Sequence, residues 1–214
     1  MTISIIDYGM GNLRSVQKGF EKIGEEAKII HSPREVLDAG ALVLPGVGAF
    51  KKCFQNLESL NLIPPILQSI KSGKPFMGIC LGLQILFSKS EEFGDTPGLD
   101  VIKGKVVRFQ KEQFEPRTEN TTGHFKIPHM GWNTISLKKT CPHLKNIEEN
   151  TFFYFVHSYY VVPEETDLIA TTTSYRSEFV SSIWKDNIFA CQFHPEKSQT
   201  VGLKVLKNFT AIAQ

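Results

Sequence analysis

Residues 75–87, PFMGICLGLQILF, constrain the fold of this chain more than any other stretch. An apolar run typical of a β-strand changes there into a helix-like pattern, and Cys80 stands at the change between Gly78 and Gly82. This spacing is typical of a nucleophile elbow, in which a strand turns sharply into a helix and strains the residue at the tip. The glycines are required because side chains there would collide with the neighbouring strand or the helix start.

Two interpretations of Cys80 follow from this pattern. The positive end of a helix stabilises a thiolate, which favours a nucleophile at its N-terminus. The alternative is a packing cysteine beside glycines that only let helix and strand approach each other. The complete elbow favours the nucleophile, and a thiolate that attacks a carbonyl needs a proton donor for the leaving group. We therefore expect a partner base elsewhere in the chain.

The rest of the chain predicts an α/β protein. Strands are predicted at residues 3–7, 27–31, 41–45 and 76–79. Helical spacing at residues 13–24 and 63–73 separates some of them, which indicates a parallel sheet covered on both faces. After about residue 94, successive strand-like runs predict antiparallel additions to the same sheet, before a closing helix at 199–212. The expected fold class is α/β, with a mixed, mostly parallel central sheet flanked by helices, in one domain over residues 1–214.

Composition excludes several classes of function. The formal charge is +2 and no run of five like charges occurs, so neither a nucleic acid nor an anionic membrane is an expected partner. The N-terminus lacks a basic region, and no apolar stretch is long enough to cross a bilayer, which predicts a cytoplasmic protein. Four cysteines without a CxxC pair predict free thiols, with neither a disulfide framework nor a zinc ribbon. Residues 110–125 are polar and predict an exposed loop.

His194 is the strongest candidate for the partner base. It follows an apolar strand-like run and precedes Pro195 and Glu196. In an extended segment, residues two apart point the same way, so Glu196 could orient the imidazole of His194. A metal site is the rival interpretation, because Cys191, His194 and Glu196 are all possible ligands. The zinc deaminase pattern fails because no cysteine follows Cys191, and strand alternation assigns Cys191 to core packing.

The other histidines are weaker candidates. Four of them stand in polar or loop-like surroundings and are predicted to be surface residues: His31, His124, His129 and His143. His157 ends an aromatic strand and could lie near a site.

A glycine-rich loop, PGVG at residues 45–48, follows the apolar run at 41–44. Such a strand-to-helix loop presents backbone N–H groups that can hold a phosphate or an oxyanion. Alone it is weak support for either. Beside a nucleophile elbow on a neighbouring strand, the oxyanion interpretation is favoured.

Together, PGVG, GICLGLQ and QFHPE resemble the class I, triad-type glutamine amidotransferases, over nearly the whole chain. Three further stretches are similar to the glutaminase subunits of imidazole glycerol phosphate synthase: IDYGMGNLRS at 6–15, IPHMGWN at 127–133 and YFVHSY at 154–159. The HPEKS sequence completes the set. The resemblance implies hydrolysis of L-glutamine to glutamate and ammonia, without a cofactor or metal.

The same resemblance implies a role for each matching residue. Cys80 would form a glutamyl thioester, His194 would protonate the departing ammonia and then activate water, and Glu196 would orient His194. The remaining matches divide into an oxyanion set, a substrate set and a partner set. The oxyanion set is Gly46, Val47, Gly48 and Leu81; the substrate set is Gln84, Glu92, Ser158 and Tyr159; the partner set is Asn12, Trp132, Tyr154 and Lys197.

Plain structural roles stay open for some of these residues. From the residues alone, Gln84 is an ordinary helix-surface glutamine and Glu92 belongs to a solvated acidic turn. Trp132 and Tyr154 could be core residues. The partner that the resemblance implies is a (β/α)8-barrel cyclase, which joins ammonia to a ribonucleotide in a heterodimer.

Other functions also stay open. A paralogous glutaminase that serves sugar amidation in surface-polysaccharide synthesis has similar motifs. The loop at residues 110–125 is longer than the family pattern, and Asp100 replaces a frequent glycine, which leaves the pathway open. Two alternatives belong to other functional classes. One is a stand-alone cysteine hydrolase that acts on γ-glutamyl peptides, and the other is a catalytically silent interaction subunit.

Overall fold

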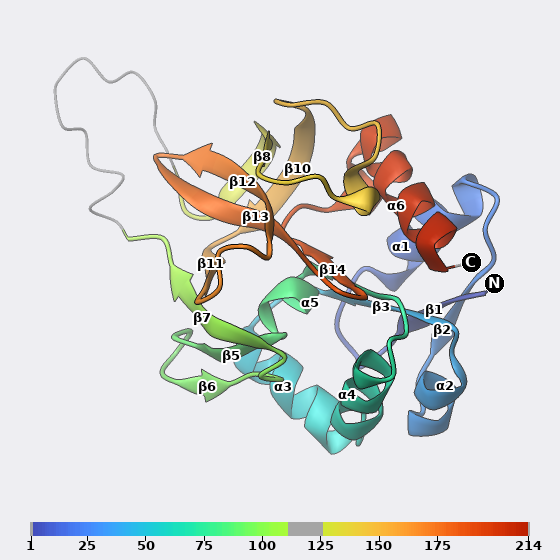
Figure 1. Cartoon of the computed structure of the whole chain (residues 1–214). Coiled ribbons are helices and arrows are strands. Elements are labelled where there is room, and N and C mark those ends of the chain that lie inside the picture. The colour runs from blue at the N-terminus through green and yellow to red at the C-terminus, as the bar shows by residue number, and fades with distance from the viewer. Residues whose placement is uncertain (1, 111–125, 214) are drawn as a thin grey trace, which may run out of the picture.

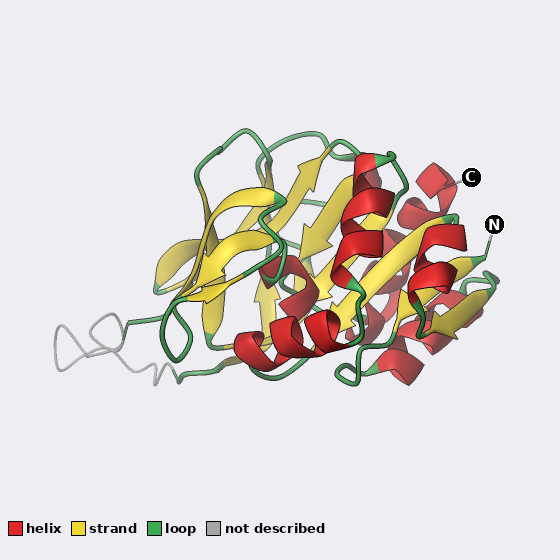
Figure 2. Cartoon of the chain, turned by 90° about the horizontal axis from the view of Figure 1, so that it is seen from below, coloured by secondary structure: helices red, strands yellow, loops and turns green. Residues whose placement is uncertain are grey.

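The computed structural model describes residues 2–110 and 126–213. Within them, the chain forms a twelve-stranded sheet with helices against both faces and a separate two-stranded sheet (Figures 1 and 2). The predicted loop at 110–125 lies outside the described residues from residue 111 on. No helix in the described ranges combines the length and apolar character needed to cross a membrane.

The half of the large sheet formed mostly by the first hundred residues is parallel. Its strands lie in the order β2 (Ala27–Ile30), β1 (Ile3–Ile6), β3 (Ala41–Gly46), β4 (Phe76–Cys80) and β14 (Ile188–Cys191). All neighbouring pairs in this series are parallel. Most of these strands are buried along their length, as expected of a parallel sheet covered on both faces.

The sheet continues beyond β14 with mainly antiparallel pairs. Next come β13 (Ser177–Lys185), β11 (Tyr159–Pro163), β7 (Ile102–Arg108), β5 (Phe87–Ser90) and β6 (Thr96–Pro97). Two strands branch from β13: β12 (Ile169–Tyr175) and then β9 (Ser136–Leu137). Only the pair β5 and β7 is parallel among these described strands. The predicted fold class is confirmed.

The sheet divides the core into two layers, and helices cover each of its faces (Figure 1). α1 (Leu13–Lys22) and α6 (Gln199–Ala213) pack on one face, where their apolar side chains meet alternate residues of the parallel strands. The opposite face is covered by α2 (Pro33–Asp38), α3 (Phe50–Ser59) and α4 (Ile63–Lys71). Burial of these apolar faces removes the sheet from water and is the main stabilising contribution.

Two expectations about the second half of the chain were wrong. Among the described strands, β8 (His129–Thr134) and β10 (Phe152–His157) pair only with each other instead of joining the main sheet. β14 is antiparallel to β13 but parallel to β4, so it extends the parallel half of the sheet and is not a purely antiparallel addition. Alternation of apolar residues identifies a strand but not its partner, because the partner is fixed by contacts far along the sequence.

The helix after Cys80 is much shorter than the sequence pattern indicates. α5 spans only Leu81–Gln84, and β5 begins at Phe87. The chain leaves the helix because the carbonyls of Ile85 and Leu86 accept backbone hydrogen bonds from residues 99, 101 and 102. One helical turn therefore supplies local N–H groups beside Cys80 rather than the dipole of a long helix.

We predict that Gly82→Ala destabilises the protein by about 3 kcal/mol, because an added methyl group overlaps the backbone carbonyl of Leu44 on β3. Gly73→Ala is the matched control. Gly73 has a φ of +84° but open space around its Cα, so only the strained backbone contributes, at about 1 kcal/mol. Urea unfolding of both variants measures the difference. Equal losses of stability would contradict the proposed packing constraint.

Candidate active site

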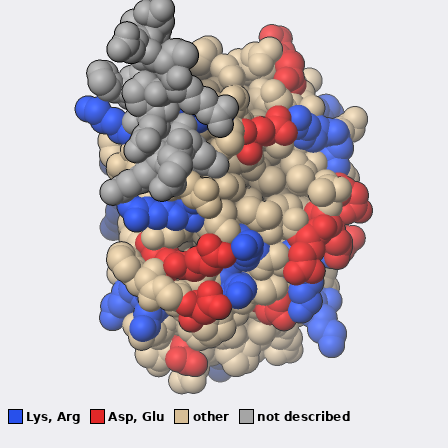
Figure 3. Space-filling view, turned by 90° about the vertical axis from the view of Figure 1, so that its left-hand side faces the viewer, with Lys and Arg blue, Asp and Glu red and all other residues tan. Residues whose placement is uncertain are grey.

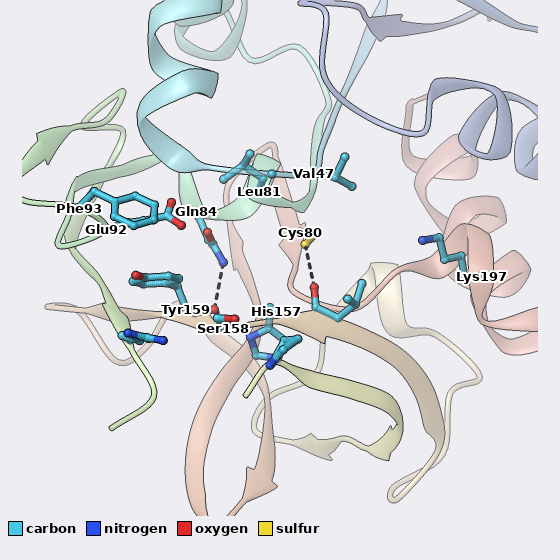
Figure 4. A pocket seen from close by; sticks show the side chains of 14 residues that line it. Val47, Cys80, Leu81, Gln84, Glu92, Phe93, His157, Ser158, Tyr159 and Lys197 are labelled. Carbon is cyan, nitrogen blue, oxygen red and sulfur yellow. Dashed lines mark hydrogen bonds between the residues drawn. The ribbon is translucent and has the colours of Figure 1, made fainter. Parts of the chain in front are cut away.

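Cys80 occupies a strained position at the tip of a strand-to-helix elbow. It ends β4, precedes α5 and has φ +56° and ψ −105°, a combination that L-residues rarely adopt. A methyl group at Gly78 would overlap the carbonyl of Gly82, and one at Gly82 would overlap β3. The predicted steric role of both glycines is confirmed, and the elbow directs the Cys80 side chain into a cavity (Figure 4).

His194 and Glu196 form a buried pair just beyond β14. His194 Nδ1 lies 2.7 Å from Glu196 Oε1, and each side chain is only 2% exposed. The backbone N–H of His194 donates to Tyr154 O at 2.9 Å, and the Ser198 hydroxyl donates to His194 O at 2.7 Å. These bonds hold the backbone of His194 in place, and the contact with Glu196 fixes its ring. Its other nitrogen, Nε2, is buried and has no hydrogen-bond partner in the described structure, which leaves it available to a thiol.

The electrostatics of His194 reflect its two acidic neighbours. Burial alone lowers the pKa of an imidazole, but interactions with Cys80 and Glu196, through charge and hydrogen bonding, outweigh it and raise the pKa of His194 to about 10. The site therefore favours a charged imidazolium between Cys80 and the Glu196 carboxylate. That arrangement combines a nucleophile with a proton donor.

Two glutamine side chains connect Cys80 to the cavity wall. Gln192 Nε2 donates to Cys80 Sγ at 3.5 Å, and the Cys80 thiol points to Val156 O at 3.9 Å. Gln84 Nε2 donates both to Gln192 Oε1 and to Tyr159 O, each at 3.0 Å. Both donors of Gln84 are therefore used within the protein. Only its carbonyl oxygen remains for a ligand, so Gln84 is no ordinary surface residue.

The cavity has a volume of about 570 Å³ and collects most of the predicted site residues. Nine of them line it: Val47, Gly48, Cys80, Leu81, Gln84, Glu92, Ser158, Tyr159 and Lys197. Five lining residues were not assigned to the site from the sequence, although His157 was considered close to one: Phe93, Arg108, Pro128, Val156 and His157. Figure 4 shows the labelled side chains gathered around one space. His194 and Glu196 do not line it and are buried.

The predicted oxyanion residues lie next to the thiol. Gly46 at the end of β3 pairs in register with Cys80 at the end of β4. Val47 is 39% exposed, and Gly48 has a φ of +97°, which favours glycine. Leu81 is the first residue of α5. Two backbone segments, residues 46–48 and the start of α5, thus border Cys80.

The predicted substrate residues already make contacts of their own. Glu92 Oε2 accepts the backbone N–H of Phe50 at 2.6 Å, which fixes the carboxylate at the start of α3. The carbonyl of Ser158 accepts the N–H of Phe109 at 3.1 Å. Glu92 is therefore anchored rather than part of a freely solvated turn, and its second oxygen remains available.

Three of the predicted partner residues form one cluster. The rings of Trp132 and Tyr154 meet edge to face with centroids 6.1 Å apart, and Lys197 Nζ lies 5.8 Å from the centre of the Tyr154 ring. Trp132 is 46% exposed, so core packing does not explain it, and Tyr154 is half-buried. Asn12 has a different contact, since its side chain caps α1 by accepting the N–H of Ser15.

The surface prediction for His129 and His143 was wrong. Both are buried, and burial lowers the pKa of each to about 4. His143 stacks on Phe189 with ring centroids 4.6 Å apart. His31 is exposed as expected, and His124 lies outside the described residues. The residues next to His129 and His143 in the sequence are polar or loop-like, so they gave no signal of the aromatic contacts that distant elements make.

Cys191 packs in the core, as predicted. It is fully buried among apolar residues, and its thiol donates to Phe193 O at 3.4 Å. Burial raises the pKa of this thiol well above its usual value. Across residues 2–110 and 126–213, no group of three or more histidine, cysteine, aspartate or glutamate side chains could hold a metal ion.

Comparison with known proteins defines the class. The family model "Glutamine amidotransferase class-I" matches residues 4–213, and the chain belongs to this family. Solved structures support the fold. PurLQS from Thermotoga maritima is 16% identical and superposes with a TM-score of 0.75 over 100% of this chain and 99% of that chain. A glutamine amidotransferase from the same organism is 15% identical, with a TM-score of 0.62, covering 99% and 83%.

More similar relatives define the particular group. "Imidazole glycerol phosphate synthase subunit HisH" of Syntrophotalea carbinolica is 52% identical over 97% of this chain and 98% of its own length. The protein with the same name from Geobacter sulfurreducens is 54% identical over 97% of both chains. Within the class-I glutamine amidotransferases, this chain is a member of the HisH family.

We predict that Glu196→Gln flattens the pH dependence of stability between about pH 7 and pH 9. The pKa of His194 is about 10 in the folded chain, against 6.5 for an ordinary histidine, so its stabilising contribution is complete below 6.5. It is lost as the pH rises through about 10. Removal of the Glu196 charge lowers that pKa. The slope of the unfolding free energy against pH then falls by up to about 1 kcal/mol per pH unit.

Urea unfolding at several pH values measures this slope. The control is Glu178→Gln, which removes a carboxylate that is paired with Lys138 and 61% exposed, and it should leave the slope unchanged. If Glu196→Gln and the wild type showed the same slope, the contribution of the Glu196 charge to the raised pKa of His194 would be contradicted.

Proposed function

We propose that this chain is the glutaminase subunit of imidazole glycerol phosphate synthase in histidine biosynthesis. It hydrolyses L-glutamine to glutamate and ammonia through Cys80, His194 and Glu196. The observation that carries the proposal is a strained cysteine that opens onto a cavity and is electrostatically coupled to a buried His–Glu pair. The HisH relatives supply the pathway.

The reaction follows from the positions of these groups. Cys80 Sγ attacks the side-chain amide carbon, and the negative charge that develops on oxygen is held by the N–H of Leu81 and the backbone of residues 46–48. His194 transfers a proton to the amide nitrogen as the carbon–nitrogen bond breaks, which releases ammonia and leaves a glutamyl thioester. His194 then takes a proton from water, whose oxygen displaces Cys80 and yields glutamate.

The cavity wall suits the zwitterionic end of an amino acid. Glu92 is held by Phe50 N–H through one oxygen, so the other can accept from the substrate ammonium group. Arg108 lines the same cavity and can pair with the carboxylate. Gln84 offers only its carbonyl, which suits a donor such as the substrate ammonium or amide N–H. Ser158 and Tyr159 form the adjoining backbone wall.

A partner should receive the ammonia, because free ammonia is largely protonated in neutral water and then no longer nucleophilic. We assign this role to a (β/α)8-barrel cyclase in a heterodimer. Three side chains of the β8–β10 sheet support a docking surface: Met130 is 62%, Trp132 46% and Phe152 57% exposed. Aromatic side chains and methionine are favoured at interfaces. Lys197 lies between this surface and the cavity.

The remaining parts of the proposal follow from composition and packing. Residues 1–214 act as one glutaminase domain, without a cofactor. On the face in Figure 3, basic and acidic side chains are interspersed, which agrees with the formal charge of +2 and with a small-molecule substrate rather than a nucleic acid. All four cysteines are free, as expected of a protein in the reducing cytoplasm.

The alternative functions are not favoured. The relatives at about half identity are subunits of imidazole glycerol phosphate synthase by name, which speaks against the polysaccharide paralogue. The exposed apolar side chains of the β8–β10 sheet are better explained by a subunit than by a stand-alone hydrolase. An intact elbow with its acid–base pair gives a silent subunit no support.

We predict that the purified chain releases glutamate slowly alone and at least about tenfold faster with the cyclase and its ribonucleotide substrate. Cys80→Ala removes the nucleophile and should reduce the rate by on the order of 10⁴-fold or more. Cys141→Ala, which changes a buried thiol outside the cavity, is the control and should retain activity. Full activity without the cyclase, or no response to it, would contradict the histidine-pathway assignment.

A further inference from the structure

Two buried histidines connect strand β8 to the wall of the cavity by hydrogen bonds. Asn133 Nδ2 lies 3.2 Å from His129 Nε2, and His129 Nδ1 lies 2.9 Å from His157 Nε2. His157 Nδ1 in turn lies 2.8 Å from the carbonyl oxygen of Tyr159. The two histidines are 3% and 6% exposed. None of the catalytic steps above uses either ring.

The hydrogen-bonding groups at the two ends of this series, Asn133 and the Tyr159 carbonyl, fix the position of every ring proton between them. The Tyr159 carbonyl can only accept, so His157 Nδ1 carries a proton. In a neutral ring Nε2 must then accept, which requires His129 Nδ1 to donate. The Nε2 atom of His129 accepts in the same way, and its neighbour is the amide nitrogen of Asn133, a donor. Donation therefore runs in one direction, from Asn133 to Tyr159.

Other contacts hold Asn133, at the outer end of this hydrogen-bonded series. Asn133 Oδ1 accepts the N–H of Thr134 at 2.8 Å, and Asn133 Nδ2 also donates to Ser174 O at 3.0 Å, so its amide cannot turn over without breaking both bonds. The His129 ring lies between the rings of Phe155 and Tyr175, with centroids 4.9 and 4.0 Å away.

Both rings stay neutral at physiological pH. Burial lowers the pKa of His129 to about 4. Burial, with a further contribution from His129, lowers that of His157 to about 3. A proton added to either ring would replace an acceptor with a donor and set two N–H groups against each other. The neutral chain is therefore the form that matches the geometry.

The inner end of the hydrogen-bonded series, the Tyr159 carbonyl, lies at the predicted substrate wall. The Tyr159 carbonyl accepts from His157 Nδ1 and from Gln84 Nε2 at once. The position of the Tyr159 carbonyl, together with Gln192 Oε1, therefore fixes where the amide of Gln84 lies and which way the free carbonyl of Gln84 points. Gln84 Nε2 also donates to Gln192 Oε1, and Gln192, which contacts Cys80, is held in place by the bond from its own backbone N–H to Ser181 O at 2.8 Å.

We propose that His129 and His157 are positioning residues for glutamine binding. Their hydrogen bonds fix the Tyr159 carbonyl, which orients Gln84 so that its own carbonyl faces a donor group of the substrate. The inference rests on the proposed glutaminase function. It assigns the two histidines to substrate affinity rather than to the reactivity of Cys80.

The test compares His129→Phe with the wild type, both in the complex with the cyclase. Phenylalanine keeps the ring stacking but removes the donor to His157. The KM for glutamine should rise about tenfold, the effect of one well-placed hydrogen bond, while kcat changes less. Inactivation by the glutamine analogue 6-diazo-5-oxo-L-norleucine at low concentration should slow in proportion. Inactivation of Cys80 by iodoacetamide, which does not need the substrate wall, should keep its rate.

Two further variants complete the comparison. His143→Phe makes the same change at another buried, stacked histidine away from the cavity and should leave both inactivation rates unchanged. His129→Asn restores a donor near the position of Nδ1 and should recover most of the affinity. The inference would be overturned if His129→Phe matched His143→Phe, or if both reagents slowed equally. A wild type without glutaminase activity would instead refute the proposed function.

Nitrogen-15 NMR of the unmutated protein tests the same inference without relying on a variant that must fold. Both His129 and His157 should carry their single ring proton on Nδ1. A proton on Nε2 of either ring would reverse the direction of donation and overturn the proposal.

Discussion

The close approach of α5 to β3 is the constraint on which the site depends. Gly82 packs against the backbone of Leu44, and this contact turns the chain sharply enough to hold Cys80 at positive φ. Because β3, β4 and β14 are parallel neighbours, their carboxyl ends meet at one edge of the sheet. Residues 46–48, Cys80 and His194 lie at or just beyond those three ends, as expected of ligand sites in open α/β sheets.

Burial determines the chemistry of the groups collected there. His194 and Glu196 are removed from water, so the negative charges beside the imidazole act strongly and favour its charged form. His129 and His157 are buried with no carboxylate beside them among the described residues, so the same loss of water keeps them neutral. The same region thus holds a histidine in a setting that favours its charged form and two neutral ones whose hydrogen bonds have a fixed direction.

Local patterns predicted much of this arrangement. The strands and helices around the elbow, and the pairing of His194 with Glu196, follow from spacing over a few residues. Features that depend on contacts between distant segments could not be predicted. Nothing local shows that β8 and β10 pair apart from the main sheet, or that carbonyls after Gln84 are used elsewhere and end α5 after one turn. His129 is buried by aromatic rings from β10 and β12, and Gln192 reaches Cys80 only across the fold.

Covalent trapping of the reaction intermediate tests the central claim most directly. Protein mixed with glutamine, quenched in acid during turnover and digested would be analysed by mass spectrometry. The account predicts a glutamyl group attached through a thioester to the peptide that contains Cys80, and its absence from Cys80→Ala. A glutamyl group on Cys53, Cys141 or Cys191, or continued turnover by Cys80→Ala, would contradict it.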